Sequence, residues 1–68
     1  MNPEKIVNGL THRSNAVFKN ADGLRKSISR QGHSVYMIVV DDNIKRINRT
    51  EAVKYVKGLI DDGFELIS

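Results

Sequence analysis

The residues of this chain that could do chemistry are mostly basic, and few of them are groups that build metal or catalytic sites. His12 and His33 are the only histidines and cysteine is absent, whereas a zinc site needs three or four protein ligands. No serine lies in a Gly-x-Ser-x-Gly turn, and neither of the common glycine-rich phosphate loops occurs. We therefore predict a protein that is not an enzyme and that uses no metal and no cofactor.

The basic side chains are concentrated in the first half of the chain. Residues 1–33 carry six Lys and Arg against two acids, whereas residues 34–68 carry five against six. A basic segment is typical of proteins with nucleic-acid or other anionic partners, although such charge also serves solubility. The candidate nucleic-acid-binding residues form two clusters along the chain: Lys19, Arg25, Lys26 and Arg30, and then Lys45, Arg46 and Arg49.

The clearest element that could position these residues is a helix after Asn48. Asn48 and Glu51 have the spacing of a capping box, in which side chains and main-chain N–H groups bond reciprocally at a helix start. Gly63 suits the left-handed conformation that ends a helix, with Phe64 packing back on the last turn. Between them, apolar residues recur at helical spacing: Ala52, Val53, Val56, Leu59 and Ile60.

A β-hairpin is predicted immediately before this helix. Residues 35–40 are apolar on both alternating sides, which is typical of an interior strand, and we predict that they form the central strand. Residues 41–43, Asp-Asp-Asn, tolerate the positive φ of a tight turn. Ile44–Ile47 would return as an edge strand. Phe64–Ile67 would then pair with the central strand on its other side.

Residues 14–31 admit two interpretations. In the first, a single helix runs from Ser14 to Gln31 with one apolar and one basic side. In the second, a strand covers Asn15–Lys19 and a shorter helix begins near Asn20 or Asp22. Gly23 favours the second, because glycine costs about 1 kcal/mol in a helix interior. A helix, glycine and strand would then occur twice, with Gly32 corresponding to Gly63. The apolar stripe of the long helix would be Val17, Phe18, Ala21, Leu24 and Ile28.

The N-terminal residues also admit two structures. Asn2-Pro3-Glu4 is typical of a helix start, and Ile6, Val7 and Leu10 would then dock on the core. Asn8-Gly9, in contrast, is typical of a tight hairpin turn.

Together these elements predict one domain over residues 1–68 with a two-layer α+β fold. Two principal helices would lie on a three- or four-stranded, mainly antiparallel sheet. A chain of this length buries only about 60% of its extended surface, so we expect self-association to a dimer. No apolar segment approaches the ~20 residues of a membrane span, and Met-Asn-Pro-Glu-Lys lacks the apolar stretch of a signal peptide. We therefore expect a cytoplasmic protein with no membrane partner.

The function that follows is non-enzymatic binding, by a protein-binding regulator or inhibitor. Its partner would use an exposed sheet edge or the apolar face that two helices leave uncovered. The alternative is a small basic protein that contacts nucleic-acid phosphates through its N-terminal helix. The four aromatic residues fit core positions, with Tyr55 the best candidate for a surface contact: Phe18, Tyr36, Tyr55 and Phe64.

Overall fold

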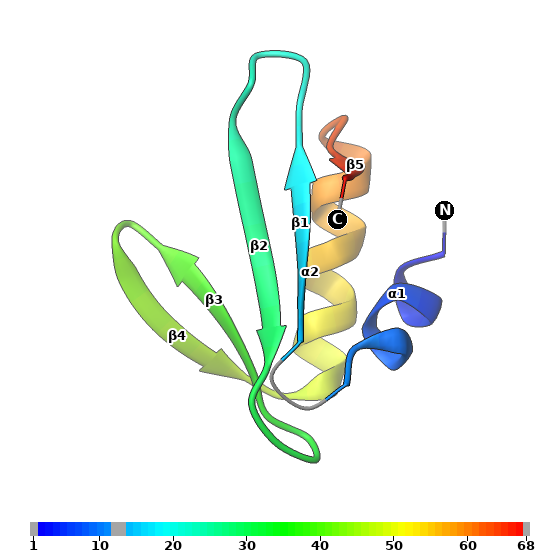
Figure 1. Cartoon of the computed structure of the whole chain (residues 1–68), viewed down its shortest axis with the longest axis vertical. Helices are drawn as coiled ribbons and strands as arrows, with labels where there is room; N and C mark the ends of the chain where they lie inside the picture. Colours follow the sequence, from blue (N-terminus) through cyan, green and yellow to red (C-terminus); the bar gives the residue numbers. More distant parts are fainter. Residues whose placement is uncertain (1, 12–13, 68) are drawn as a thin grey trace.

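The computed structural model describes residues 2–11 and 14–67, which form two layers (Figure 1). The elements are α1 (Pro3–Gly9), β1 (Asn15–Lys19), β2 (Arg25–Arg30), β3 (Tyr36–Val40), β4 (Asn43–Ile47), α2 (Arg49–Asp61) and β5 (Glu65–Leu66). The strands form one antiparallel sheet in the order β4-β3-β2-β1-β5. The predicted two-layer α+β fold is confirmed, with five strands in place of three or four.

The N-terminal helix forms as its cap residue predicts. The Asn2 side chain accepts hydrogen bonds from the main-chain N–H groups of Glu4 and Lys5, which have no partner inside the helix. Val7 is completely buried and Leu10 nearly so, so α1 docks on the core. The alternative of a hairpin turn at Asn8-Gly9 is wrong, because both residues belong to α1.

Helix α2 has the predicted signal at each end. The Asn48 side chain accepts from the Glu51 N–H at 2.8 Å, and the Glu51 carboxylate accepts from the Asn48 N–H at 3.4 Å. At the other end Gly63 has φ +88°. The Gly63 N–H donates to the Ile60 carbonyl, and the Phe64 N–H donates to the Leu59 carbonyl. This pair of bonds is a Schellman motif, and it directs Phe64 into the core.

The hairpin of β3 and β4 is confirmed, but its place in the sheet differs from the prediction. Asp41 and Asp42 both have positive φ, as a two-residue turn of this kind requires. The central strand is β2, and β3 lies between β2 and β4. Strand β5 pairs with β1 at the far edge, so the predicted pairing of 64–67 with residues 35–40 is wrong. In Figure 1, α2 runs alongside β1. The end of α2 therefore lies near the edge of the sheet at which β5 pairs with β1.

Residues 14–31 contain no helix, so the long helix of the first interpretation and the shorter helix of the second are both wrong. The strand at Asn15–Lys19 is confirmed, but β2 follows it in place of a second helix. The intervening turn is held by Asn20, whose side chain accepts from the N–H groups of Asp22 and Leu24. Gly23 supplies the positive φ of this turn, at +85°. The apolar spacing that resembles a helix arises from two strands joined by that turn, so the helix-glycine-strand repeat does not exist.

The core lies between the helices and one side of the sheet. Residues that pair directly in neighbouring strands point to the same side, and Ala16, Ile28 and Ile38 form one such row. All three are buried, together with Phe18, Tyr36 and Ile47 from the sheet and Ala52, Val56 and Leu59 from α2. Both helices therefore cover the same side of the sheet.

Two glycines of the C-terminal helix region should respond oppositely to alanine. Gly58 lies within α2, and a β-carbon added there would meet no atom within 4 Å beyond the neighbouring helix backbone, so Gly58→Ala should raise the free energy of unfolding by about 1 kcal/mol. Gly63 has equal space but positive φ, so Gly63→Ala should lower it by about 1–2 kcal/mol. Urea denaturation of both variants measures the two signs. Equal effects would mean that α2 does not end at Gly63.

Candidate functional site

Neither helix covers the other side of the sheet, which we call the open face. Its apolar side chains alternate along the strands with the core residues. Ile44 is 67% exposed, Val39 57% and Ile67 49%. Val17 and Met37, both partly buried, complete the apolar part of this face. The open face thus presents aliphatic groups from β3 and β4 and from the β1 side of the sheet, with Ser27 and Ser29 of the central strand β2 between them.

Three of the predicted basic residues lie on the open face. Lys19 and Arg25 are directly paired at one end of the β1–β2 ladder, and Glu65 of β5 pairs with Lys19 on its other side. Arg46 pairs with Met37 toward the opposite end of the sheet. The aliphatic side chains of the open face consequently share it with three cations and one carboxylate.

The structure separates two further basic residues from this group. Lys26 pairs with the buried Phe18 and Lys45 pairs with the buried Ile38, so both point to the helix side. The Lys26 ammonium lies 5.9 Å from the centroid of the Phe64 ring, within the range of a cation–π contact. The predicted basic helix surface is therefore wrong, because its residues belong to a hairpin and divide between two sides of the sheet.

The remaining two basic residues hold the fold together. The Arg30 guanidinium donates to the carbonyls of Leu10, Gly32 and His33 at 2.8–2.9 Å, and it lies 6.0 Å from the centroid of the Tyr36 ring. Arg49 donates through two nitrogens to the Asn8 side-chain oxygen, which ties α2 to α1. Three N–H groups of Arg30 and two of Arg49 are thus used within the chain, which gives both residues a structural role.

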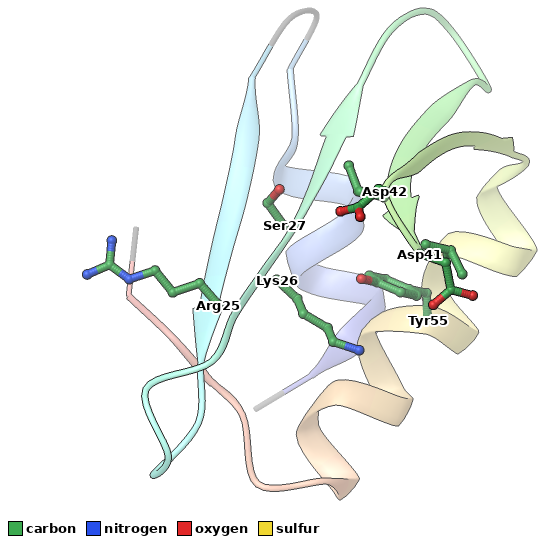
Figure 2. Close-up of a pocket in the computed structure, with 8 residues that line it drawn as sticks. Arg25, Lys26, Ser27, Asp41, Asp42 and Tyr55 are labelled. Carbon is green, nitrogen blue, oxygen red and sulfur yellow. The ribbon is translucent and has the colours of Figure 1, made fainter.

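A cleft of about 380 Å³ opens between the two hairpins (Figure 2). Strands β1 and β2 pair over five residue pairs, whereas β2 and β3 pair over three and separate after Ile28 and Ile38. Figure 1 shows the two hairpins diverging from a common base. Beyond the last pair, the walls are residues 25–27 of β2 and residues 39–42 of the β3–β4 hairpin, with Tyr55 of α2 between them.

The side chains around the cleft are divided between the two sides of the sheet. Lys26 and Tyr55 point into the space on the helix side, whereas Arg25 points away from it on the open face (Figure 2). Burial raises the pKa of the Tyr55 phenol above its ordinary value. The phenol therefore keeps its proton at neutral pH and offers an O–H donor beside the Lys26 ammonium.

Neither metal-binding nor membrane-spanning features emerge from the described residues. Within residues 2–11 and 14–67, no three His, Cys, Asp or Glu side chains gather to hold a metal ion. His33 is exposed and His12 lies outside the described residues. No helix of this part of the chain has the length and apolar character needed to cross a membrane.

Comparison with known proteins identifies no relative. No protein-family model matches this chain, and neither curated proteins nor solved structures give a significant match. The function must therefore be inferred from the surface of the molecule itself.

The apolar part of the open face was not predicted residue by residue. Val39 and Ile44 stood in predicted strands, but the sequence did not assign them to a side of the sheet. The available signal was the period-two pattern of β2, Arg-Lys-Ser-Ile-Ser-Arg, whose single apolar residue marks the covered side. Recognising β2 as a strand would have fixed the phase of its neighbours.

Arg30 and Arg25 should differ sharply when each is replaced by lysine. Arg30→Lys should lower the free energy of unfolding by about 1–2 kcal/mol, because a single ammonium cannot serve three carbonyls placed around a guanidinium. Arg25→Lys, on the exposed open face, should change it by less than about 0.5 kcal/mol. Thermal and urea unfolding measure both. Equal stability of the two variants would mean that the fold does not depend on the Arg30 guanidinium, which would then be a candidate for ligand binding again.

Proposed function

We propose that this protein is a cytoplasmic, non-enzymatic binding module, a regulator or inhibitor that docks a protein partner on its open face. The observation that carries the proposal is the exposure of Val39, Ile44 and Ile67 on the side of the sheet that neither helix covers. Scattered apolar residues are ordinary on protein surfaces, whereas grouped ones mark interaction sites. Here they share one side of one sheet.

Charge on the same face indicates the chemistry of the partner. Lys19, Arg25 and Arg46 outnumber Glu65, which gives the open face a net charge of +2. Protein interfaces commonly combine an apolar centre with a polar rim of complementary charge. The partner that fits is a protein surface with an apolar centre and an excess of carboxylates around it.

Nucleic-acid binding is the second candidate, and one observation favours it. Lys19 and Arg25 are adjacent on the open face and Arg46 lies on the same side, so three cations could contact phosphates together. Two features weigh against it. Arg30 and Arg49 form hydrogen bonds within the chain and do not join the three cations of the open face. The four aromatic rings are elsewhere, so the open face has no platform on which bases could stack.

A pair of charge substitutions separates these candidates. Val39→Lys and Ile44→Lys should each weaken binding of the protein partner at least tenfold, because each places an ammonium in an apolar contact. A photo-cross-linking residue at position 44 should capture the partner from nuclease-treated lysate of the source cells, and purified partner then serves for titration. Lys57→Ala, on the exposed side of α2, is the matched control and should bind normally.

These variants also give nucleic-acid binding a distinct outcome. Added lysines should strengthen phosphate binding, and nuclease should abolish capture. Tighter binding by Ile44→Lys would therefore contradict the protein-partner proposal.

We further propose that the free chain self-associates weakly through the same face, in competition with the partner. Two open faces would bury their aliphatic centres together, but each carries a net charge of +2, so they repel. Salt screens this repulsion, so the dimer should be stronger at 0.5 M than at 0.05 M NaCl, on the order of a few-fold. Sedimentation equilibrium measures it, with Ile44→Lys as the monomeric control. A monomer at high micromolar concentration in both salts would contradict self-association.

A further inference from the structure

Strand β4 forms one edge of the sheet. In the part of the chain that the structure describes, no element pairs with its outer side, which lies at the margin of the molecule in Figure 1. The two-residue turn between β3 and β4 makes Val40–Asn43 a hydrogen-bonded pair. Bonded and non-bonded pairs alternate along antiparallel strands. The main-chain groups of Lys45 therefore point to β3, whereas the N–H and C=O groups of Ile44 and Arg46 point outward.

The rest of the sheet gives the same assignment independently. The Arg30 N–H donates to the Ser14 carbonyl, so even-numbered residues of β2 bond to β1 and odd-numbered residues of β2 bond to β3. By the register of β2 and β3, even-numbered residues of β3 then bond to β4. Their partners are the odd-numbered residues of β4, which again leaves Ile44 and Arg46 facing outward.

The outer edge of β4 lacks most of the features that block the addition of a strand. It has five residues without a proline, and it pairs with β3 at five consecutive positions without a bulge. The opposite edge of the sheet offers less, because β5 has two residues, of which Leu66 directs its main chain outward. Strand addition is therefore expected at β4.

We infer that the protein partner adds an extended segment to the outer edge of β4, as a sixth strand bonded to the main chain of Ile44 and Arg46. The inference rests on the proposed function and specifies how the partner is held. Unpaired strand edges bind extended peptides through backbone hydrogen bonds, and the alternate side chains of the peptide supply specificity. Because the side chains of Ile44 and Arg46 belong to the open face, this edge continues the proposed docking surface.

The side chains of β4 determine which segment fits. Lys45 points to the helix side of the sheet, and Ile44 and Arg46 point to the open face. Side chains directly opposite in neighbouring strands interact, favourably for opposite charges and unfavourably for like charges. The residue beside Ile44 should therefore be apolar, and those beside Lys45 and Arg46 should be acidic. An antiparallel segment, the more stable arrangement, would read acidic, acidic, apolar.

A second copy of this chain fits the same edge less well. Antiparallel pairing of two β4 strands about Lys45 or Arg46 would place like charges directly opposite each other. Pairing about Ile44 would place Arg46 opposite Asp42, which has φ 65° and lies in the turn beyond the extended edge. Charge complementarity therefore favours an acidic segment.

The probe for this inference is a displayed library of random twelve-residue peptides, selected against the full chain. Enriched peptides should share the acidic, acidic, apolar pattern. Their synthetic forms should then be methylated at one amide nitrogen at a time. Every second N–H of an added strand bonds to the edge, so methylation should weaken binding about tenfold at alternate positions and little between them.

A backbone variant locates the segment on the protein. The chain of 68 residues can be made by chemical synthesis, with an ester oxygen in place of the Ile44 N–H and no change of side chain. This N–H is not used in pairing with β3, so the variant should fold and should bind the enriched peptides about three- to tenfold more weakly. The same replacement at Leu66, whose N–H points outward from β5, is the matched control and should bind normally.

A charge exchange tests the register without altering the main chain. Lys45→Glu should weaken binding of an enriched peptide by about fivefold, because it opposes two carboxylates. Lysine in place of the second acidic residue of the peptide should restore binding to this variant. Restoration by lysine at the first acidic position instead would contradict the inferred register. If the Ile44 ester does not fold, this exchange and the methylation pattern decide.

The remaining outcomes overturn the inference. Weakening by the Leu66 ester and not by the Ile44 ester would place the segment on β5. Peptides that Ile44→Lys no longer binds, but that tolerate every methylation, would dock by side chains alone, which leaves the proposed function intact. A dimer that the Ile44 ester abolishes in sedimentation equilibrium would make a second copy the occupant. Failure to enrich any peptide would reject strand addition, while photo-cross-linking at position 44 separately decides whether a protein partner exists.

Discussion

The Arg30 guanidinium holds the point at which the two hairpins meet. Its three hydrogen bonds connect β2 to the carbonyl that follows α1 and to two carbonyls of the β2–β3 turn. Its contact with the Tyr36 ring adds the first residue of β3. Arg30 thereby holds four segments together at one end of the sheet: β2 itself, the residue after α1, the β2–β3 turn and the start of β3. Because only that end is fixed, the hairpins are free to diverge at the other, and the cleft follows from this geometry.

Coverage of the sheet follows from how little helix the chain contains. Helices α1 and α2 span 7 and 13 residues, and both pack on the side that holds Phe18, Ile28 and Tyr36. Residues 2–11 and 14–67 supply no further element to cover the opposite side, which remains exposed to solvent. A sheet with one solvated side normally places polar residues there. This one does so in β2, with Ser27 and Ser29, but retains valine and isoleucine in β3 and β4. We assign that departure from the pattern to binding.

The sequence predicted those elements whose signals are local and unambiguous. The caps of Asn2 and Asn48, the Gly63 helix end and the Asp41-Asp42 turn each depend on a few neighbouring residues, and each formed as predicted. The prediction for residues 14–31 was wrong because the apolar spacing of Phe18, Ala21, Leu24 and Ile28 fits a helix. In the structure, Ala21 and Leu24 are exposed in the turn. The turn signal lies in Asn20 and Gly23, which the helical interpretations place at a helix start and in a helix interior. Strand order could not be predicted, since it depends on how α2 crosses the sheet and not on any strand's own composition.

The wrong helix prediction also explains why the candidate site differs from the predicted basic surface. A helix displays a basic side as one surface, whereas a hairpin sends successive residues to opposite sides of the sheet. Arg25 and Lys26 are neighbours in sequence, yet only Arg25 joins Lys19 on the open face. Arg30, another member of the predicted cluster, became a structural contact because its position in β2 brings it beside three carbonyls. What remains is a modest positive charge beside exposed aliphatic side chains on one face of the sheet. Phosphates would use only the charge, whereas an acidic and apolar protein surface would use both features.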